Sequence, residues 1–145
     1  MLRLLHQHHA REVDAALRAA GFTDIRPHHA SVFPYVPPEG IQVSEIATLA
    51  RVRKQSAAEA VAQLERAGYV ERRPDPNDGR ARLVFLTPRG EAVRPIAQKA
   101  GRQVEAHWAE LIGAEALESL RATMGDLLTA IRQEPIADTE SPLEH

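Results

Sequence analysis

Residues 64–90 read LERAGYVERRPDPNDGRARLVFLTPRG and form the most informative stretch of this 145-residue chain. Two runs rich in strand-forming residues, YVERR at 69–73 and RARLVFL at 80–86, flank a turn built from Pro, Asp, Asn and Gly. Short strands around such a turn predict a two-stranded β-hairpin. The hairpin carries four arginines, namely Arg72, Arg73, Arg80 and Arg82.

Two helices separated by a tight turn are expected directly before this hairpin. Apolar residues at helical spacing predict a helix that begins near Ser44, and a break around residues 51–52 separates it from a second helix that runs to Ala67. Gly68 is suited to end the second helix, because glycine readily adopts a left-handed backbone. Helix, turn, helix and hairpin in this order predict a winged helix-turn-helix, whose second helix can enter the major groove of duplex DNA.

Helices are also expected on both sides of this unit. An amphipathic helix runs from the N-terminus to Gly21, and a short helix from Pro27 is expected to kink or stop at Pro34. Downstream, Thr87 can cap a helix of about twenty residues that starts at Pro88, where the missing N–H of proline is not needed. Gly113 ends this helix, and a last helix carries an apolar stripe of Leu117, Leu120, Met124, Leu127, Leu128 and Ile131. The fold class expected is therefore mainly α with a small two-stranded β wing.

Composition excludes several classes of protein. The chain has no cysteine, which rules out a disulfide scaffold, a thiol nucleophile and a cysteine zinc site. It contains no apolar run of the roughly 18 residues that a membrane span needs and no signal-peptide pattern, so we expect a cytoplasmic location. Hydrophobic residues make up 43% of the chain, which is ordinary for a globular domain.

Charge is distributed unevenly along the chain, although its formal net value is only −2. Residues 51–94 contain ten Lys or Arg and six Asp or Glu, a balance of +4, while the rest of the chain holds eight against fourteen, a balance of −6. A basic centre in an acidic chain favours a localised contact with phosphates over general coating of nucleic acid.

The second helix of the pair has a polar face suited to reading DNA bases. With Ala57, Ala60, Val61 and Leu64 as its buried stripe, the outward side carries Gln55, Glu59, Ala62 and Arg66, flanked by Ser56, Ala58 and Gln63. Gln can bond the edge of adenine, Ser can bond either partner, and Ala can touch a thymine methyl group.

The hairpin arginines are suited to contact phosphates or a narrow groove. This interpretation is favoured over the alternative that they only form a solvated face of the strands. Arg80, beside the turn, is best placed to enter a minor groove. Two roles stay open for Asp78, because its carboxylate could hold the Arg80 guanidinium or could serve only the geometry of the turn.

Residues 44–91, SEIATLARVRKQSAAEAVAQLERAGYVERRPDPNDGRARLVFLTPRGE, resemble the MarR family of bacterial winged-helix transcription regulators, and the resemblance extends over about residues 26–132. Its most specific part is residues 64–90, which fit that family's Leu-Glu, Gly-Tyr/Leu-Val, Arg-x-x-Asp-x-x-Asp-x-Arg and Leu-Thr-x-x-Gly pattern almost position by position.

The resemblance implies a homodimeric repressor that responds to a ligand, uses no cofactor, and binds a pseudo-palindromic operator in double-stranded DNA. The parts expected are an N-terminal dimerisation helix at 1–25, a winged domain at 26–90, C-terminal dimerisation helices at 91–134, and a flexible tail at 135–145 that includes a tag remnant. Carried over by position, the groove-facing residues are Lys54, Gln55, Ser56, Ala58 and Glu59, with Arg80 and Asp78 at the wing tip.

Three residues depart from the family pattern. Arg51 stands where a turn glycine is usual, and Arg53 stands where a Ser or Thr helix cap is usual; both could contact phosphates instead. Glu59 stands where a basic or polar residue is usual. It could accept a hydrogen bond from the amino group of cytosine, or it could pair with Arg66 or Gln63.

The family resemblance also implies an effector crevice between the helical base and the winged domain, suited to a small aromatic or lipophilic compound. The expected lining is His9, Val13, His28, Val32, Phe33 and Trp108, which are also plausible core positions. The histidines at 6, 8, 9, 28 and 29 lack the ligand spacing of a metal site, so packing at a helix interface is the favoured interpretation. A pH-sensitive interface is a further alternative.

Two other functions compete with a DNA-binding regulator. A winged helix can hold a protein instead of DNA, with its arginines meeting an acidic partner. An enzyme is disfavoured, because the sequence offers no nucleophile with a paired base, no phosphate-cradling glycine loop and no spaced carboxylate and histidine ligands.

Overall fold

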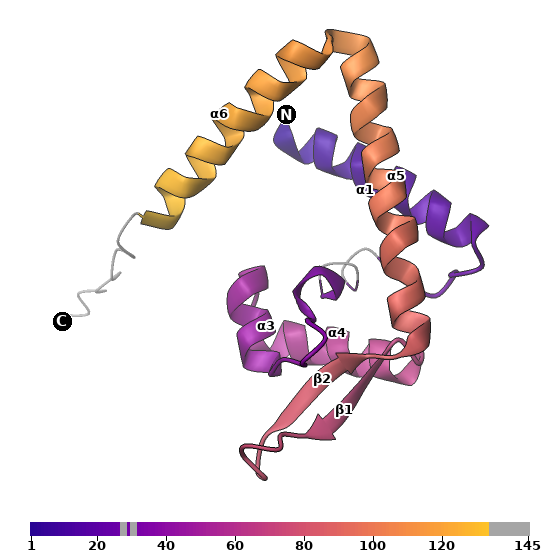
Figure 1. Ribbon diagram of the computed structural model, residues 1–145, viewed down its shortest axis with the longest axis vertical. Coiled ribbons are helices and arrows are strands. Elements are labelled where there is room, and N and C mark those ends of the chain that lie inside the picture. The colour runs from indigo at the N-terminus through magenta and orange to yellow at the C-terminus, as the bar shows by residue number, and fades with distance from the viewer. Residues whose placement is uncertain (27–28, 30–31, 134–145) are drawn as a thin grey trace, which may run out of the picture. The chain divides into compact units, whose positions relative to one another are not determined.

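The computed structural model describes residues 1–26, 29 and 32–133 (Figure 1). The chain divides into two compact units, Met1–Val104 and Glu105–His145, and α5 runs across the division. Within the described residues, no helix is both long and apolar enough to cross a membrane. The elements are α1 (Leu2–Ala19), η1 (Phe33–Tyr35), α3 (Val43–Ala50), α4 (Lys54–Arg66), β1 (Val70–Pro74), β2 (Arg82–Leu86), α5 (Pro88–Ile112) and α6 (Ala114–Gln133).

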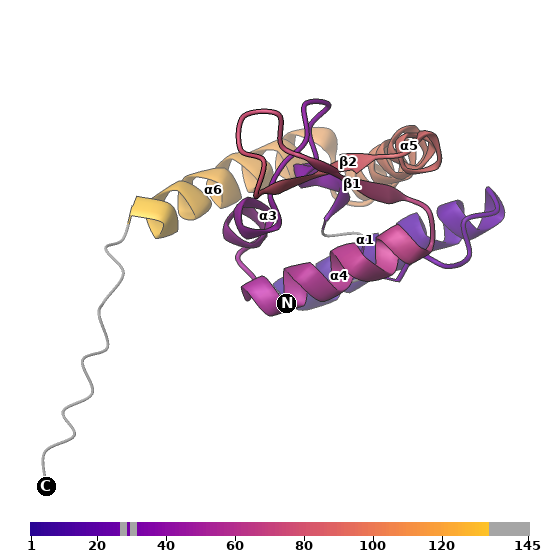
Figure 2. The ribbon, with the colours of Figure 1, turned by 90° about the horizontal axis from the view of Figure 1, so that it is seen from below.

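A winged helix-turn-helix forms the centre of the first unit. Figure 2 shows α3 beside the N-terminal end of α4 and the β-hairpin beside the same helix. The residues of α4 that face the core form the stripe predicted from the sequence, namely Ala57, Ala60, Val61 and Leu64. They pack with Ile46 of α3 and with Val70 and Val84 of the hairpin, all nearly inaccessible to solvent. Burial of this apolar stripe fixes the side of α4 that remains outside.

The predicted hairpin is present, and its two strands are antiparallel. Val70 lies opposite Leu86, and Arg73 lies opposite Leu83. Ile41 adds an isolated bridge, because its N–H and carbonyl group both bond to Val84, at 3.2 and 2.8 Å. The hairpin is therefore anchored at its base to the chain before α3, while its turn is the free end (Figure 1).

The start of α5 lies directly against the base of the hairpin. Thr87 caps this helix as predicted: the N–H of Gly90 donates to its Oγ1 at 3.2 Å, and the Thr87 hydroxyl donates to the Gly68 carbonyl oxygen at 2.6 Å. A side chain at Gly90 would collide with the backbone carbonyl of Tyr69. The Leu-Thr-x-x-Gly pattern thus has a packing reason, since only glycine lets the helix approach this carbonyl.

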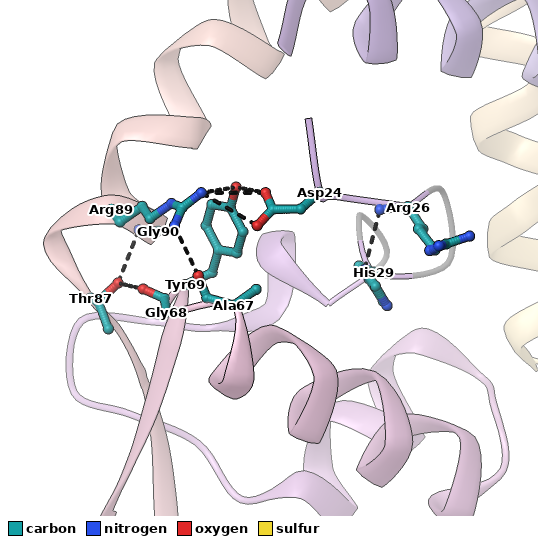
Figure 3. Close-up of polar contacts among 9 residues, drawn as sticks. All are labelled: Asp24, Arg26, His29, Ala67, Gly68, Tyr69, Thr87, Arg89 and Gly90. Carbon is teal, nitrogen blue, oxygen red and sulfur yellow. Dashed lines mark hydrogen bonds and ion pairs between the residues drawn. The ribbon is translucent and has the colours of Figure 1, made fainter. Parts of the chain in front are cut away.

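A buried tyrosine joins three separate segments of the first unit (Figure 3). The Tyr69 hydroxyl donates to the Asp24 carboxylate and accepts from Arg89 Nη2 at 3.1 Å. The Arg89 guanidinium also donates to the Ala67 carbonyl oxygen and lies 4.5 Å from the centre of the Tyr69 ring. This network ties the loop after α1 and the first turn of α5 to the base of the wing.

Alkaline pH is expected to weaken this network. Burial raises the pKa of the Tyr69 phenol above its ordinary value of 10.0, and the hydrogen bond to Asp24 raises it further, while Arg89 acts in the opposite direction. The folded protein therefore holds this proton more tightly than the unfolded chain, so the contribution to stability is full below pH 10 and is lost as the pH rises through the folded value.

Urea unfolding at neutral pH and above pH 10 measures this loss. We expect Tyr69→Phe to cost about 1 kcal/mol at neutral pH and to show a smaller alkaline loss than the wild type. Tyr35→Phe is the control, because it removes the only other tyrosine hydroxyl in the chain. An equal alkaline loss in wild type and Tyr69→Phe would contradict the assignment.

The segment before α3 contains two prolines that bear on the sequence predictions, Pro27 and Pro34. The short helix expected from Pro27 begins outside the described residues. Pro34 lies near the start of the 3₁₀ turn η1, where proline is tolerated. The predicted turn at 37–40 is present, and Gly40 there has a positive φ of 82°.

The second unit contains the end of α5 and the whole of α6. Gly113, with φ 90°, separates the two helices as predicted. Arg121 of α6 pairs with Glu105 at 2.9 Å and with Glu118 at 3.3 Å. No residue of α6, all of which the structure describes, is buried. Its large apolar side chains that remain exposed are Leu120, Leu127, Leu128 and Ile131.

Candidate nucleic-acid interface

The outward side of α4 carries several exposed polar and charged side chains. Lys54, Gln55, Ser56 and Glu59 are exposed, and Ala58 is half-buried between them. Among the described residues, neither Glu59 nor Arg66 makes a hydrogen bond or ion pair. The proposed pairing of Glu59 with Arg66 or Gln63 is therefore absent from the structure.

The turn before α4 is shaped by two arginines. Arg51 ends α3 with φ 54° and ψ 44°, a left-handed conformation, and it is the only described residue other than glycine with a positive φ. The glycine usual at this position would adopt this backbone without strain. Arg53 occupies the N-cap of α4 and makes no capping hydrogen bond through its side chain. Both side chains are exposed at the N-terminal end of the helix, where the helix dipole also favours anions.

Two of the four wing arginines form ion pairs with other side chains of the protein. Arg72 lies on the strand face that points to the core, is half-buried, and pairs with Glu65 of α4 at 3.4 Å. Arg73 lies on the opposite face, where it pairs with Glu71 and stacks on the Phe85 ring at 4.8 Å. These contacts show how both arginines stabilise the wing, and they leave Arg72 the least accessible of the four.

The turn of the wing presents the other two arginines. Arg80 and Arg82 are exposed and make no side-chain ion pair within the described part of the chain. Asp78 Oδ1 accepts from the backbone N–H of Arg80 at 3.1 Å, and Asp75 Oδ1 accepts from that of Asn77 at 2.8 Å. Of its two proposed roles, Asp78 thus performs the turn role here, and the Arg80 guanidinium is left available.

The residues expected to line an effector crevice are only partly brought together. Val32 and Phe33 are buried in the core, and Val13 packs against the same cluster. The His9 ring lies near Gly101 of α5. Trp108 is half-exposed and belongs to the second unit, and His28 lies outside the described residues.

A pocket of about 280 Å³ lies elsewhere, between α3 and α4. Of the expected lining only Val32 borders it, together with Ile46, Ala50, Val52, Ser56, Ala57, Glu59, Ala60 and Gln63. Val52, which lines this pocket, is an exposed apolar residue of the turn between the two helices. Its position at the helix break was the available signal, since an inter-helix turn places side chains at the surface.

His29 has a structural explanation. It is 5% exposed, its Nδ1 accepts from the N–H of Arg26 at 3.2 Å, and its Nε2 bonds to the Gln63 side chain. It therefore connects the segment before η1 to α4. Figure 3 shows its contact with Arg26. No group of three or more metal-ligating side chains occurs among the residues that the structure describes.

Part of the sequence matches a known protein family. The sequence profile described as the MarR family matches residues 35–81, from η1 to the wing turn. Residues 35–81 therefore carry the sequence pattern of the MarR family. Among its curated relatives, it is 26% identical over 101 residues to the uncharacterized HTH-type transcriptional regulator YybA of Bacillus subtilis (strain 168), a match covering 70% of this chain and 65% of the relative. It is 28% identical to the transcriptional regulator HosA of Escherichia coli O111:H-, covering 72% and 78%. The match thus spans less than two thirds of YybA.

Solved structures share the fold of this chain. Apo MarR from E. coli superposes with a TM-score of 0.70 at 23% identity, covering 88% of this chain and 93% of MarR. CouR from Rhodococcus jostii RHA1, bound to p-coumaroyl-CoA, gives 0.68 at 23% identity, covering 87% of each chain. A MepR mutant from S. aureus bound to an oligodeoxyribonucleotide gives 0.60 at 18%, covering 90% and 94%.

Proposed function

We propose that this chain is a homodimeric transcription regulator of the MarR family that binds a specific DNA sequence and acts as a repressor released by a small-molecule effector. The DNA-binding part rests on one observation: the polar face of α4 is exposed, and so are the cations on both sides of it. Arg51, Arg53 and Lys54 lie at the start of α4, and Arg80 and Arg82 lie at the wing turn.

This distribution fits the two parts of a duplex contact. Side chains on α4 can meet base edges in a major groove, while exposed arginines of the wing contact phosphates or the adjacent minor groove. The MepR structure, which contains an oligodeoxyribonucleotide, supports DNA as the ligand of a chain with this fold.

Exposed apolar surface supports a homodimer. A helix of 20 residues that buries none of its own side chains needs a partner surface, because an amphipathic stripe is stable only when it is covered. Leu2, Leu4 and Leu5 of α1 are exposed as well, and so are Leu111 and Ile112 at the end of α5. A second copy of the chain offers the same apolar surface, which suits a twofold symmetric interface. Sedimentation equilibrium should therefore give twice the mass of the chain.

The effector part of the proposal rests on the buried cluster beside α1. Val13, Val32 and Phe33 supply an apolar surface and His9 supplies a polar group, a combination typical of sites for small aromatic or lipophilic compounds. CouR bound to p-coumaroyl-CoA supports a ligand of this general class for the fold.

Fluorescence anisotropy tests the proposed function. A labelled duplex from the region immediately upstream of the coding sequence is titrated over a series of salt concentrations, with an unrelated duplex as control and with or without a panel of phenolic compounds. We expect preference for the upstream duplex, a steep fall of affinity with salt, and release by one phenol. No binding to either duplex at low salt would favour a protein-interaction module instead.

Arg51→Gly is expected to change stability and DNA affinity in opposite directions. Glycine removes the left-handed strain at φ 54°, which should raise the free energy of unfolding by about 1 kcal/mol. It also removes a cation at the start of α4, so the salt slope should fall by roughly one per copy of the chain.

Arg51→Asn separates the two effects, because asparagine tolerates the left-handed conformation better than arginine yet carries no charge. Urea unfolding and anisotropy are measured on both variants. Unchanged salt slopes in both would show that Arg51 does not contact phosphate.

A further inference from the structure

The DNA-facing side of α4 contains an unexpected negative charge. The helix carries two carboxylates, and the structure treats them differently. Glu65 pairs with Arg72 of β1 at 3.4 Å. Glu59 is exposed and makes no hydrogen bond or ion pair with any described residue. A structural role within the protein therefore accounts for Glu65 and leaves Glu59 unexplained.

Glu59 shares the helix face that the proposed function directs at base edges. It lies four residues after Gln55 and three after Ser56, spacings that place side chains on one side of a helix. The helix cannot rotate so as to bury this face, because the opposite, apolar stripe of α4 is packed in the core.

An anion at this place is unfavourable unless a base donates to it. Phosphates surround a DNA-binding helix, and guanine and thymine present only acceptors to the major groove at their hydrogen-bonding edges. Adenine offers an amino group but places the N7 acceptor beside it, which repels a carboxylate. Cytosine offers its N4 amino group with one neighbouring acceptor, O6 of the paired guanine, whereas adenine N6 lies between its own N7 and O4 of the paired thymine.

We propose that Glu59 is a specificity-determining residue that accepts a hydrogen bond from cytosine N4 at one position of each operator half-site. This inference rests on the proposed DNA-binding function. It assigns to Glu59 chiefly the rejection of the other three bases, because guanine and thymine offer the carboxylate only acceptors and adenine N6 is flanked by two of them.

Selection from a random duplex library, followed by sequencing, tests this assignment. The wild type should enrich a motif with one C·G pair at the same position in both half-sites, and replacing that pair should lower affinity by about tenfold or more. In Glu59→Gln the preference should move towards adenine, which glutamine can bond through N6 and N7. Thermal unfolding confirms that each variant is folded, since both positions are exposed.

Glu65→Gln is the matched control, because it makes the same change of charge on the same helix but at a carboxylate held by Arg72. It should enrich the wild-type motif. If Glu59→Gln selects the wild-type motif unchanged, or binds every duplex more tightly by one common factor, the specificity role is refuted while DNA binding stands. If the wild type enriches no motif, the proposed function itself fails.

Discussion

Gly90→Ala is expected to destabilise the first unit by about 2 to 3 kcal/mol, although alanine is normally the better helix former. The added Cβ would overlap the carbonyl oxygen of Tyr69 and also crowd Leu86. That carbonyl oxygen already accepts from the N–H of Thr87 at 3.1 Å, so it cannot move without loss of the junction between the wing and α5. Relief of the overlap requires displacement of backbone, which is costly in a close-packed interior.

Gly125→Ala is the matched control for this prediction. Gly125 also lies inside a helix, and an added Cβ there would meet no atom within 4 Å. The same substitution should therefore raise the free energy of unfolding by up to about 1 kcal/mol. Urea unfolding of both variants measures the two changes in the free energy of unfolding, which should have opposite signs. A neutral or stabilising Gly90→Ala would mean that α5 does not approach the wing this closely.

The local elements could be predicted because their signals are carried by neighbouring residues. The α4 stripe, the Thr87 cap and the ends of helices at Gly21, Gly68 and Gly113 follow from periodicity and from the backbone freedom of glycine. The role of Gly90 could not be derived in this way. Its constraint comes from the Tyr69 carbonyl, which is 21 residues away and reaches it only in the folded chain.

The candidate site, too, could be predicted only in part from the sequence. Exposure of the α4 face and the place of Arg80 beside the turn follow from the sequence, whereas the different surroundings of Arg72, Arg73 and Arg82 appear only in the structure. The register of the strands places Arg72 towards Glu65, and only the turn geometry around Asp78 leaves Arg80 available. The lining expected for an effector crevice was hardest to predict, because such a lining depends on packing between residues that are distant in the sequence.

The double substitution Arg80→Ala with Arg82→Ala is expected to weaken binding of the operator by at least about 100-fold. Each copy of a dimer loses two exposed cations at the wing turn, so four potential contacts with phosphates or the minor groove disappear. The salt slope should become shallower by as much as about 0.9 for each contact that is lost. Stability should hardly change, because neither side chain is part of an ion pair within the described residues.

Arg72→Ala provides the comparison within the same wing. It removes an equal charge, but from a half-buried side chain that pairs with Glu65. We expect it to lower DNA affinity less than threefold, because a charge that does not contact the DNA acts on it only through screened long-range attraction. We also expect a slightly lower free energy of unfolding, because the packing of the arginine stem is lost. Anisotropy across the salt series and urea unfolding are measured on both variants. Equal losses of affinity would mean that the wing acts through its total charge, whereas a loss confined to the Arg80 and Arg82 variant places the contact at the turn.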